Sequence, residues 1–205
     1  MARPKKDDGT QEKIMQAAKK VFVSQGMMGA RMQDIADEAG MNKALLHYYF
    51  KNKEELFAAV FREAAGKLFP KINFIFEADI PLFEKIERFT EEYIGIILEN
   101  PYLPMFVLNE IGRDPKYFLE KFWNSAPRPN PQKFLKQIQD EVQKGTIKET
   151  SPLQLLLNLL SLTIFPFVAK PMFQMHLGLD EFQFRMIMEQ RKKEIPRVLI
   201  DSIKK

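Results

Sequence analysis

The sequence lacks several residue types on which common classes of site depend. It has no cysteine, and only two histidines and one tryptophan occur among its 205 residues. Disulfide frameworks and thiolate metal sites are therefore excluded. His47 and His176 alone do not provide the ligands of a designed metal site. We expect neither a metal nor any other cofactor.

Long apolar segments are also missing. Residues 1–8 are polar and charged, without the apolar run of a secretory signal. The most apolar stretch, residues 153–168, is shorter than the ~18 apolar residues of a membrane span and contains Asn158, Ser161 and Pro166. A buried helix explains this stretch better. The chain is expected to be cytoplasmic and not to enter a membrane.

The sequence motifs of enzymes are absent as well. None of the five serines lies in a nucleophile motif, and none of the nine glycines forms a phosphate-cradling loop. The adjacent carboxylates at 54–55 and 91–92 fall at helix starts or on helix faces, where they are most simply solvated. The sequence therefore predicts that the protein is not an enzyme.

The charge is distributed unevenly along the chain. Residues 1–53 hold ten Lys or Arg against six Asp or Glu, whereas the remaining residues hold 21 of each sign. The formal net charge of +4 thus belongs to the first quarter of the sequence. A basic segment attached to a neutral body favours contact with a polyanion at one end, although a solvated basic tail gives the same count.

Apolar residues recur with helical spacing throughout, which predicts an all-α fold. No sustained alternation of apolar and polar residues, typical of strands, occurs. Along residues 10–25 the apolar positions lie three and four apart, so they form one buried stripe. Thr10 can cap the start of this first helix, and Gly26 can end it in the left-handed conformation.

Two short helices follow, at 32–39 and 43–49, with a turn at Gly40 and a good cap at Asn42. Helices this short are marginal in water, and the stripe of the first helix can cover them. Residues 10–50 are therefore predicted to form a three-helix helix-turn-helix unit, whose last helix enters the DNA major groove. The predicted core comprises Ile14, Ala18, Phe22, Ile35, Ala36, Leu46 and Phe50.

Four aromatic residues end this recognition helix. Phe50 has no polar atom and should plug the core of the unit. His47, Tyr48 and Tyr49 each join an apolar body to a hydrogen-bonding tip, which suits a wet groove lined by phosphates. These three side chains are therefore predicted to face DNA.

Two lysines flank the aromatic run. Lys43 can reach a guanine edge or a phosphate, and Lys53 stands beside the N-terminal amides of a fourth helix, a second predicted phosphate site. The apolar pattern of this helix continues to Ala64. Gly66 and Pro70 then predict a kink or an end.

Further helices, separated by proline or glycine, fill the rest of the chain. They are predicted at 81–99, 101–111, 115–123, 132–144, 153–165 and 180–203, with a proline-rich loop at 125–131. The helices at 153–165 and 180–203 are candidates for a subunit interface, because two such pairs build a four-helix interface between two copies. Alternatively, both helices close the core of the monomer.

Residues 21–57, VFVSQGMMGARMQDIADEAGMNKALLHYYFKNKEELF, resemble the N-terminal domain of the TetR family of bacterial transcriptional regulators. In that family a Gly ends the first helix, an Ile-Ala pair lies in the second, Ala-Gly makes the turn, and a Tyr-x-x-Phe-x-x-Lys run follows. The matching residues here are Gly26, Ile35, Ala36, Ala39, Gly40, His47, Phe50 and Lys53.

The chain departs from the family pattern at two places. The usual Thr/Ser pair that caps the second helix is Ala30-Arg31, and the usual Tyr is His47. These changes put in doubt the capping contact and a tyrosine hydroxyl contact to phosphate, although Arg31 can bind a phosphate directly. The DNA-binding residues predicted from position and resemblance are Arg31, Gln33, Asn42, Lys43, Ala44, Leu45, His47, Tyr48, Tyr49 and Lys53.

The resemblance implies a DNA-binding domain at residues 1–54 and a helical effector-binding and dimerisation domain at 55–205. The 18 Phe and 11 Met residues suit a cavity for an apolar compound, although plain core packing gives much the same composition. The candidate ligand-binding residues, which lie on the middle helices with polar groups among aromatics, are Tyr93, Met105, Phe106, Asn109, Phe122, Trp123 and Phe165.

Taken together, the sequence predicts a ligand-responsive transcriptional regulator, a homodimeric repressor that a small, largely apolar effector releases from a palindromic double-stranded DNA operator. The effector would shift the fourth helix, so that the two recognition helices no longer fit half-sites ~34 Å apart. The alternative is an all-α protein that binds lipid or a partner helix and in which the helix-turn-helix is merely structural.

Overall fold

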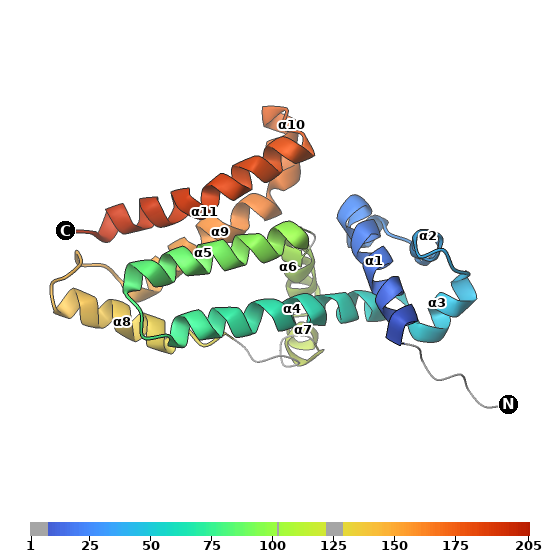
Figure 1. The fold of residues 1–205 in the computed structure, drawn as a ribbon, viewed down its shortest axis with the longest axis horizontal. Coiled ribbons are helices and arrows are strands. Elements are labelled where there is room, and N and C mark those ends of the chain that lie inside the picture. The colour runs from blue at the N-terminus through green and yellow to red at the C-terminus, as the bar shows by residue number, and fades with distance from the viewer. Residues whose placement is uncertain (1–7, 102, 122–128) are drawn as a thin grey trace. The chain divides into compact units, whose positions relative to one another are not determined.

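The computed structural model describes residues 8–101, 103–121 and 129–205, which are largely helical (Figure 1). The helices are α1 (Asp8–Gly29), α2 (Met32–Glu38), α3 (Lys43–Tyr49), α4 (Lys53–Glu77), α5 (Leu82–Glu99), α6 (Leu103–Arg113), α7 (Pro115–Lys121), α8 (Gln132–Gln143), α9 (Pro152–Val168), α10 (Lys170–Leu177) and α11 (Glu181–Ile203). Within the described ranges, β-structure is limited to one isolated bridge between Ile147 and Lys204. The predicted all-α fold is confirmed.

The first three helices form the expected cluster. Every residue predicted for its core is buried, from Ile14 in α1 to Phe50 directly after α3. Helix α2 packs against α1 and α3. The ring of Phe22 in α1 contacts that of Phe57 in α4, with centroids 4.8 Å apart. Burial against neighbouring helices thus stabilises two helices that are too short to persist alone.

The chain divides into two compact units, Met1–Ala65 with Asn100–Ser125, and Gly66–Glu99 with Ala126–Lys205. This division differs from the predicted boundary after residue 54, because α6 and α7 belong to the first unit. Phe118 of α7 is buried there, and its ring lies edge-on to that of Phe61 in α4 with centroids 5.9 Å apart. The residues of α4 are shared between the two units.

An aromatic stack lies in the second unit. The ring of Phe76 in α4 stacks on Phe89 of α5 and on Phe134 of α8, with centroid distances of 5.7 Å and 5.1 Å. Tyr93 extends the stack, 5.4 Å from Phe89. Helix α5 also packs against α9 and α11. These contacts bury aromatic area from three helices at one place.

Side chains define the starts of the two C-terminal helices that the sequence picked out. Ser151 accepts a hydrogen bond from the Gln154 amide at 3.5 Å, before Pro152 in the first turn of α9. Asp180 and Gln183 form a reciprocal capping box at the start of α11, with bonds of 2.7 Å and 2.9 Å. Both predicted starts are therefore confirmed.

The helix end predicted at Gly26 was wrong, and of the kink or end predicted at Gly66 and Pro70 the end does not occur. Helix α1 continues through Gly26 to Gly29, and α4 continues through Gly66 and Pro70 to Glu77. Proline removes one helical hydrogen bond, but it does not prevent a helix whose neighbouring turns are held by packing. In α4 the side chains around Pro70, including Phe69 and Ile72, are buried.

Helix α10 was not predicted. Pro171 occupies its first turn, and Gly178, with φ of +64°, ends it in the left-handed conformation. Among the described residues, no single helix has the length and apolar composition of a membrane span. Helices α9 and α10, bent by 63° where they meet, reach that length and composition only as a pair.

Candidate nucleic-acid interface

The turn between α2 and α3 is fixed by its own backbone. The amide of Gly40 donates to Asp37 O and that of Met41 to Ala36 O, each at 3.0 Å. Gly40 has φ of +63°, which a residue with a Cβ adopts only at a cost. The turn predicted at this glycine is confirmed, and it sets the direction in which α3 leaves α2.

Helix α3 begins as the sequence predicts. Asn42 Oδ1 accepts a hydrogen bond from the Leu45 amide at 2.7 Å, which satisfies one of the free N–H groups of the first turn. Lys43 and Ala44 follow and are exposed. The side-chain oxygen of Asn42 therefore caps the first turn of α3. Because Asn42 stands at the start of α3, it is adjacent in sequence to the exposed Lys43 and Ala44.

Helix α3 has one buried and one exposed face. Leu46 is fully buried, whereas Leu45 and Tyr48 are 38% and 40% exposed. Lys43, Ala44 and His47 are exposed too. Five of the predicted DNA-binding residues thus share the solvent side of one short helix, which offers a cation, apolar groups and two aromatic rings with polar tips.

Tyr49 does not follow the prediction that it faces outward, because its side chain is only 7% exposed. It lies three residues after the buried Leu46 and therefore on the core side of the helix. Its ring contacts that of Tyr48 edge-on, with centroids 5.4 Å apart. Tyr49 is thus a core residue of the cluster that supports Tyr48 from behind.

The ring of His47 is oriented by the backbone. Its Nδ1 lies 3.1 Å from the carbonyl oxygen of Lys51. A carbonyl only accepts, so Nδ1 carries the hydrogen, and Nε2 of the neutral ring is an acceptor. Neutral His47 can therefore accept from a base amino group, whereas a contact to phosphate through Nε2 requires the protonated ring.

Lys53 has a partner inside the protein. Its Nζ donates to the carbonyl oxygen of Ala30 at 3.0 Å, which ties the first turn of α4 to the segment before α2. The start of α4 is also closed by Asn52, whose Oδ1 accepts from the Glu55 amide at 2.8 Å. At the second predicted phosphate site, the Glu55 amide and one donor of Lys53 are therefore already hydrogen-bonded within the protein. The contact between Lys53 and Ala30 spans 23 residues, so no local sequence signal indicates it.

The start of α2 lacks the side-chain cap that is usual at this place. Arg31 occupies the cap position in an extended conformation, and its side chain makes no capping hydrogen bond. It is exposed, so its guanidinium is available on the surface. Gln33, also exposed, donates from Nε2 to Asp37 at 2.8 Å.

Three of the predicted ligand-binding side chains lie within the described residues, in different surroundings. Tyr93 is half-buried in the aromatic stack, where burial raises the pKa of its hydroxyl to about 12. Met105 is exposed on α6. Phe165 is 54% exposed, and its ring contacts Phe173 at 6.3 Å. Outside the described residues lie Phe122, Trp123 and the side chains of Phe106 and Asn109.

Comparison with known proteins agrees with this geometry. The family model "Bacterial regulatory proteins, tetR family" matches residues 14–60, which contain most of α1, all of α2 and α3, and the first turns of α4. Residues 14–60 thus have the sequence of a TetR-family N-terminal domain. The N-terminal resemblance carried by the turn glycine and the aromatic run is therefore confirmed.

Relatives in the TetR family are similar to the chain over different lengths. The repressor NicS of Pseudomonas putida is 37% identical over 73 residues, which cover 32% of this chain and 34% of NicS. The uncharacterized regulator YhgD of Bacillus subtilis is 25% identical over 149 residues, or 68% of this chain and 72% of YhgD. The chain thus spans about a third of the length of NicS and most of that of YhgD.

A solved structure of a transcriptional regulator extends the similarity beyond the first helices. The crystal structure of HlyIIR, a hemolysin II transcriptional regulator, has 25% identity and a TM-score of 0.58 over 83% of this chain and 94% of that chain. The helical body that follows the helix-turn-helix therefore has the TetR fold as well.

Proposed function

We propose that this TetR-family protein is a DNA-binding transcriptional regulator, and specifically a repressor of a palindromic operator in the bacterial cytoplasm. The observation that carries the proposal is the solvent face of α3, where Lys43, His47 and Tyr48 are exposed while Leu46 is buried. A recognition helix needs one face held rigidly by the protein and one free to enter the major groove. The position of Arg31 beside this helix-turn-helix supports further contacts to phosphate.

The dimer that a palindrome requires would form through an apolar surface of the second unit. Large apolar side chains are exposed on three successive helices, α9, α10 and α11. They are Leu153, Leu157, Phe165, Met172, Met175, Leu177, Phe182, Met186, Ile187 and Val198, here called the C-terminal apolar surface. So many exposed apolar groups are unusual on a monomer and are typical of an interface. A second copy of the chain is the proposed partner.

A small effector would weaken DNA binding through α4. This helix starts at Lys53, which bonds to Ala30 O before α2, and its last turns contain Phe76 of the aromatic stack. A displacement of the far end of one continuous helix is therefore passed to the segment that carries α2 and α3. The proposed consequence is a changed separation of the two recognition helices and a loss of simultaneous contact with both half-sites.

The test is DNA binding by the full-length protein. A duplex is selected from a random-sequence pool, and its affinity is measured by fluorescence anisotropy at several salt concentrations. A regulator shows a steep fall of log affinity with log salt, because each phosphate contact releases counterions. Lys43→Ala should weaken binding and reduce the salt slope by about one, whereas Lys148→Ala, an exposed lysine of the second unit, should change neither.

Two results would contradict the proposal. If the folded protein recovers no duplex above background, the alternative is favoured, namely an all-α binding protein with a structural helix-turn-helix. Equal losses for Lys43→Ala and Lys148→Ala would mean that binding is a general effect of charge and that α3 does not read DNA.

A further inference from the structure

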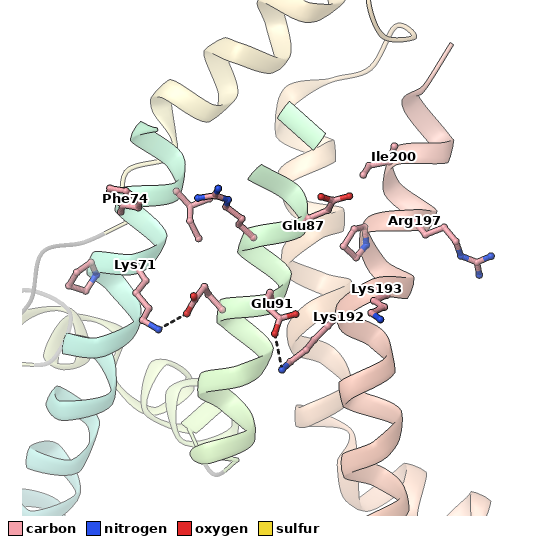
Figure 2. Close-up of a pocket in the computed structure, with 13 residues that line it drawn as sticks. Lys71, Phe74, Glu87, Glu91, Lys192, Lys193, Arg197 and Ile200 are labelled. Atoms are coloured by element: carbon pink, nitrogen blue, oxygen red, sulfur yellow. Dashed lines mark hydrogen bonds and ion pairs between the residues drawn. The ribbon is translucent and has the colours of Figure 1, made fainter. Parts of the chain in front are cut away.

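A groove in the second unit is bordered by α4, α5 and α11 and has a volume of about 890 Å³ (Figure 2). This volume lies within the range of sites for small organic ligands. None of the residues that line it is among the predicted DNA-binding or ligand-binding residues. The residues predicted from the sequence therefore give this groove no role.

The apolar part of the groove comes from α4 and α11. Phe74 is 69% exposed, and Pro70, Ile75, Pro196 and Ile200 also line the space. Figure 2 shows Phe74 on α4 and Ile200 on α11, with α5 between these helices in the view. An aromatic ring and aliphatic groups on both sides can remove a hydrocarbon chain from water, which favours binding.

Charged side chains of both signs line the groove. Five Lys or Arg residues line it, against three glutamates. Two of these glutamates already have cationic partners within the groove, since Lys71 pairs with Glu92 at 2.5 Å and Lys192 with Glu91 at 3.2 Å (Figure 2). The carboxylates of α5 are thus largely neutralised from the two neighbouring helices.

Lys192 remains charged in this setting. Burial acts to lower the pKa of its ammonium group, but hydrogen bonds to Glu189 and Glu91 outweigh that effect and raise the pKa. Its Nζ lies 2.8 Å from Glu189, so Lys192 is held in place between two carboxylates. It fixes α11 against α5 and keeps its positive charge at the edge of the groove.

Two other cations of α11 are placed to hold an anion. Lys193 is exposed and has no ion-pair partner among the described residues, and Arg197 follows it by one helical turn on the same side. Arg197 pairs with Glu194, but a guanidinium has five donors and one carboxylate occupies at most part of them. Ile187 and Val198 lie on a different face of α11, whereas Met186 lies seven residues before Lys193 and therefore on the same face.

We propose that the α4–α5–α11 groove binds an amphipathic carboxylate, with its hydrocarbon part against Phe74 and Ile200 and its carboxylate at Lys193 and Arg197. The unpaired ammonium group of Lys193 and the remaining donors of Arg197 favour an anion at this end of the groove, while Glu87 is the one lining glutamate without a cationic partner in the described structure. The apolar lining favours an amphipathic anion over a small hydrophilic one, because only the former removes Phe74 from water.

The test is isothermal titration calorimetry of the full-length protein, without DNA, using decanoate, decanol and decyltrimethylammonium below their micellar concentrations. Decanoate should bind more tightly than either of the other two. The double substitution Lys193→Glu/Arg197→Glu should weaken decanoate binding by roughly tenfold or more, and Phe74→Ser by several-fold. The matched control Lys148→Glu, an exposed lysine of the same unit outside the groove, should leave decanoate binding unchanged.

Several outcomes would overturn the proposal. They are stronger binding of decyltrimethylammonium than of decanoate, no decanoate binding by protein with an intact circular dichroism spectrum, and equal decanoate affinity in wild type and both groove variants. A change of sedimentation coefficient in Phe74→Ser would assign the groove to a protein contact instead. Because DNA is absent from the titration, each of these results leaves the proposed DNA binding intact.

Discussion

Arg191 of α11 donates from Nη2 to the carbonyl oxygen of Leu162 in α9, at 2.6 Å. Pro166 lies four residues after Leu162 inside α9 and has no N–H, so the usual helical partner of this carbonyl is missing. Arg191 supplies the missing hydrogen bond from a neighbouring helix. The proline is therefore tolerated in α9 because a charged side chain, whose pKa burial lowers, replaces the backbone donor.

Replacement of Arg191 by Met should lower the free energy of unfolding by about 1–3 kcal/mol, because it leaves the Leu162 carbonyl without its donor. Urea denaturation measures this loss, and Arg185→Met, at an exposed position of the same helix, is the control. In a Pro166→Ala background, position 166 regains its N–H, so the cost of Arg191→Met should shrink. An equal cost in both backgrounds would show that Arg191 acts through packing alone.

Lys85 gives a prediction for the pH dependence of stability. Its side chain is 1% exposed, and Nζ donates to Phe76 O in the last turn of α4 at 2.8 Å. Burial, together with the nearby charge of Lys133, lowers the pKa of Lys85 below the ordinary 10.5. Between the lowered pKa and 10.5 the unfolded chain binds more protons than the native one at this residue, so this contribution to stability rises with pH.

The prediction is tested by comparing wild type with Lys85→Met in urea denaturation at increasing pH. The difference in unfolding free energy, wild type minus variant, should grow as the pH approaches 10.5. Lys136→Met, which removes a lysine whose side chain is 75% exposed, is the surface control. A constant difference for Lys85→Met would mean that the buried ammonium is not destabilised by its surroundings.

The C-terminal apolar surface predicts the effect of a single charge on assembly. Leu157 of α9 is 45% exposed, and Leu119 of α7, in the other unit, is 46% exposed. If Leu157 is buried between two copies, Leu157→Glu places a carboxylate in an apolar interface and should raise the dimer dissociation constant by tenfold or more, about 1.4 kcal/mol. Sedimentation equilibrium measures this constant. Leu119→Glu should have no effect, and equal behaviour of the two variants would place the interface elsewhere.

The parts of the fold that the sequence predicts correctly depend on local signals. Gly40 in the turn and Asn42 at the cap act on their immediate neighbours, so the bounds of α3 could be read directly. The passage of α4 through Pro70 could not, because it depends on packing with distant helices. The same holds for Lys53, whose partner Ala30 lies 23 residues away.

The burial of Tyr49 was predictable and was missed. Helical spacing places it with Leu46 on the core side, but its polar tip suggested a contact with DNA. The exposure of Phe74 could be predicted in the same way. Ile72 and Ile75 belong to the buried stripe of α4, and helical spacing places Phe74 outside that stripe. In both cases the position on the helix was more informative than the chemical type of the side chain.

Asn42 allows the cap and the DNA contact to be separated. Asn42→Ala removes the acceptor for the Leu45 amide and should lower the free energy of unfolding by about 1 kcal/mol. Asn42→Asp keeps an acceptor and adds a negative charge at a helix start, where it is favourable, so stability should be close to wild type. The same charge near phosphate should weaken binding of the selected duplex by roughly fivefold, or about 1 kcal/mol. Thermal denaturation and anisotropy on the same preparations measure both effects, and a stable Asn42→Asp protein with unchanged DNA affinity would place the start of α3 away from the phosphate backbone.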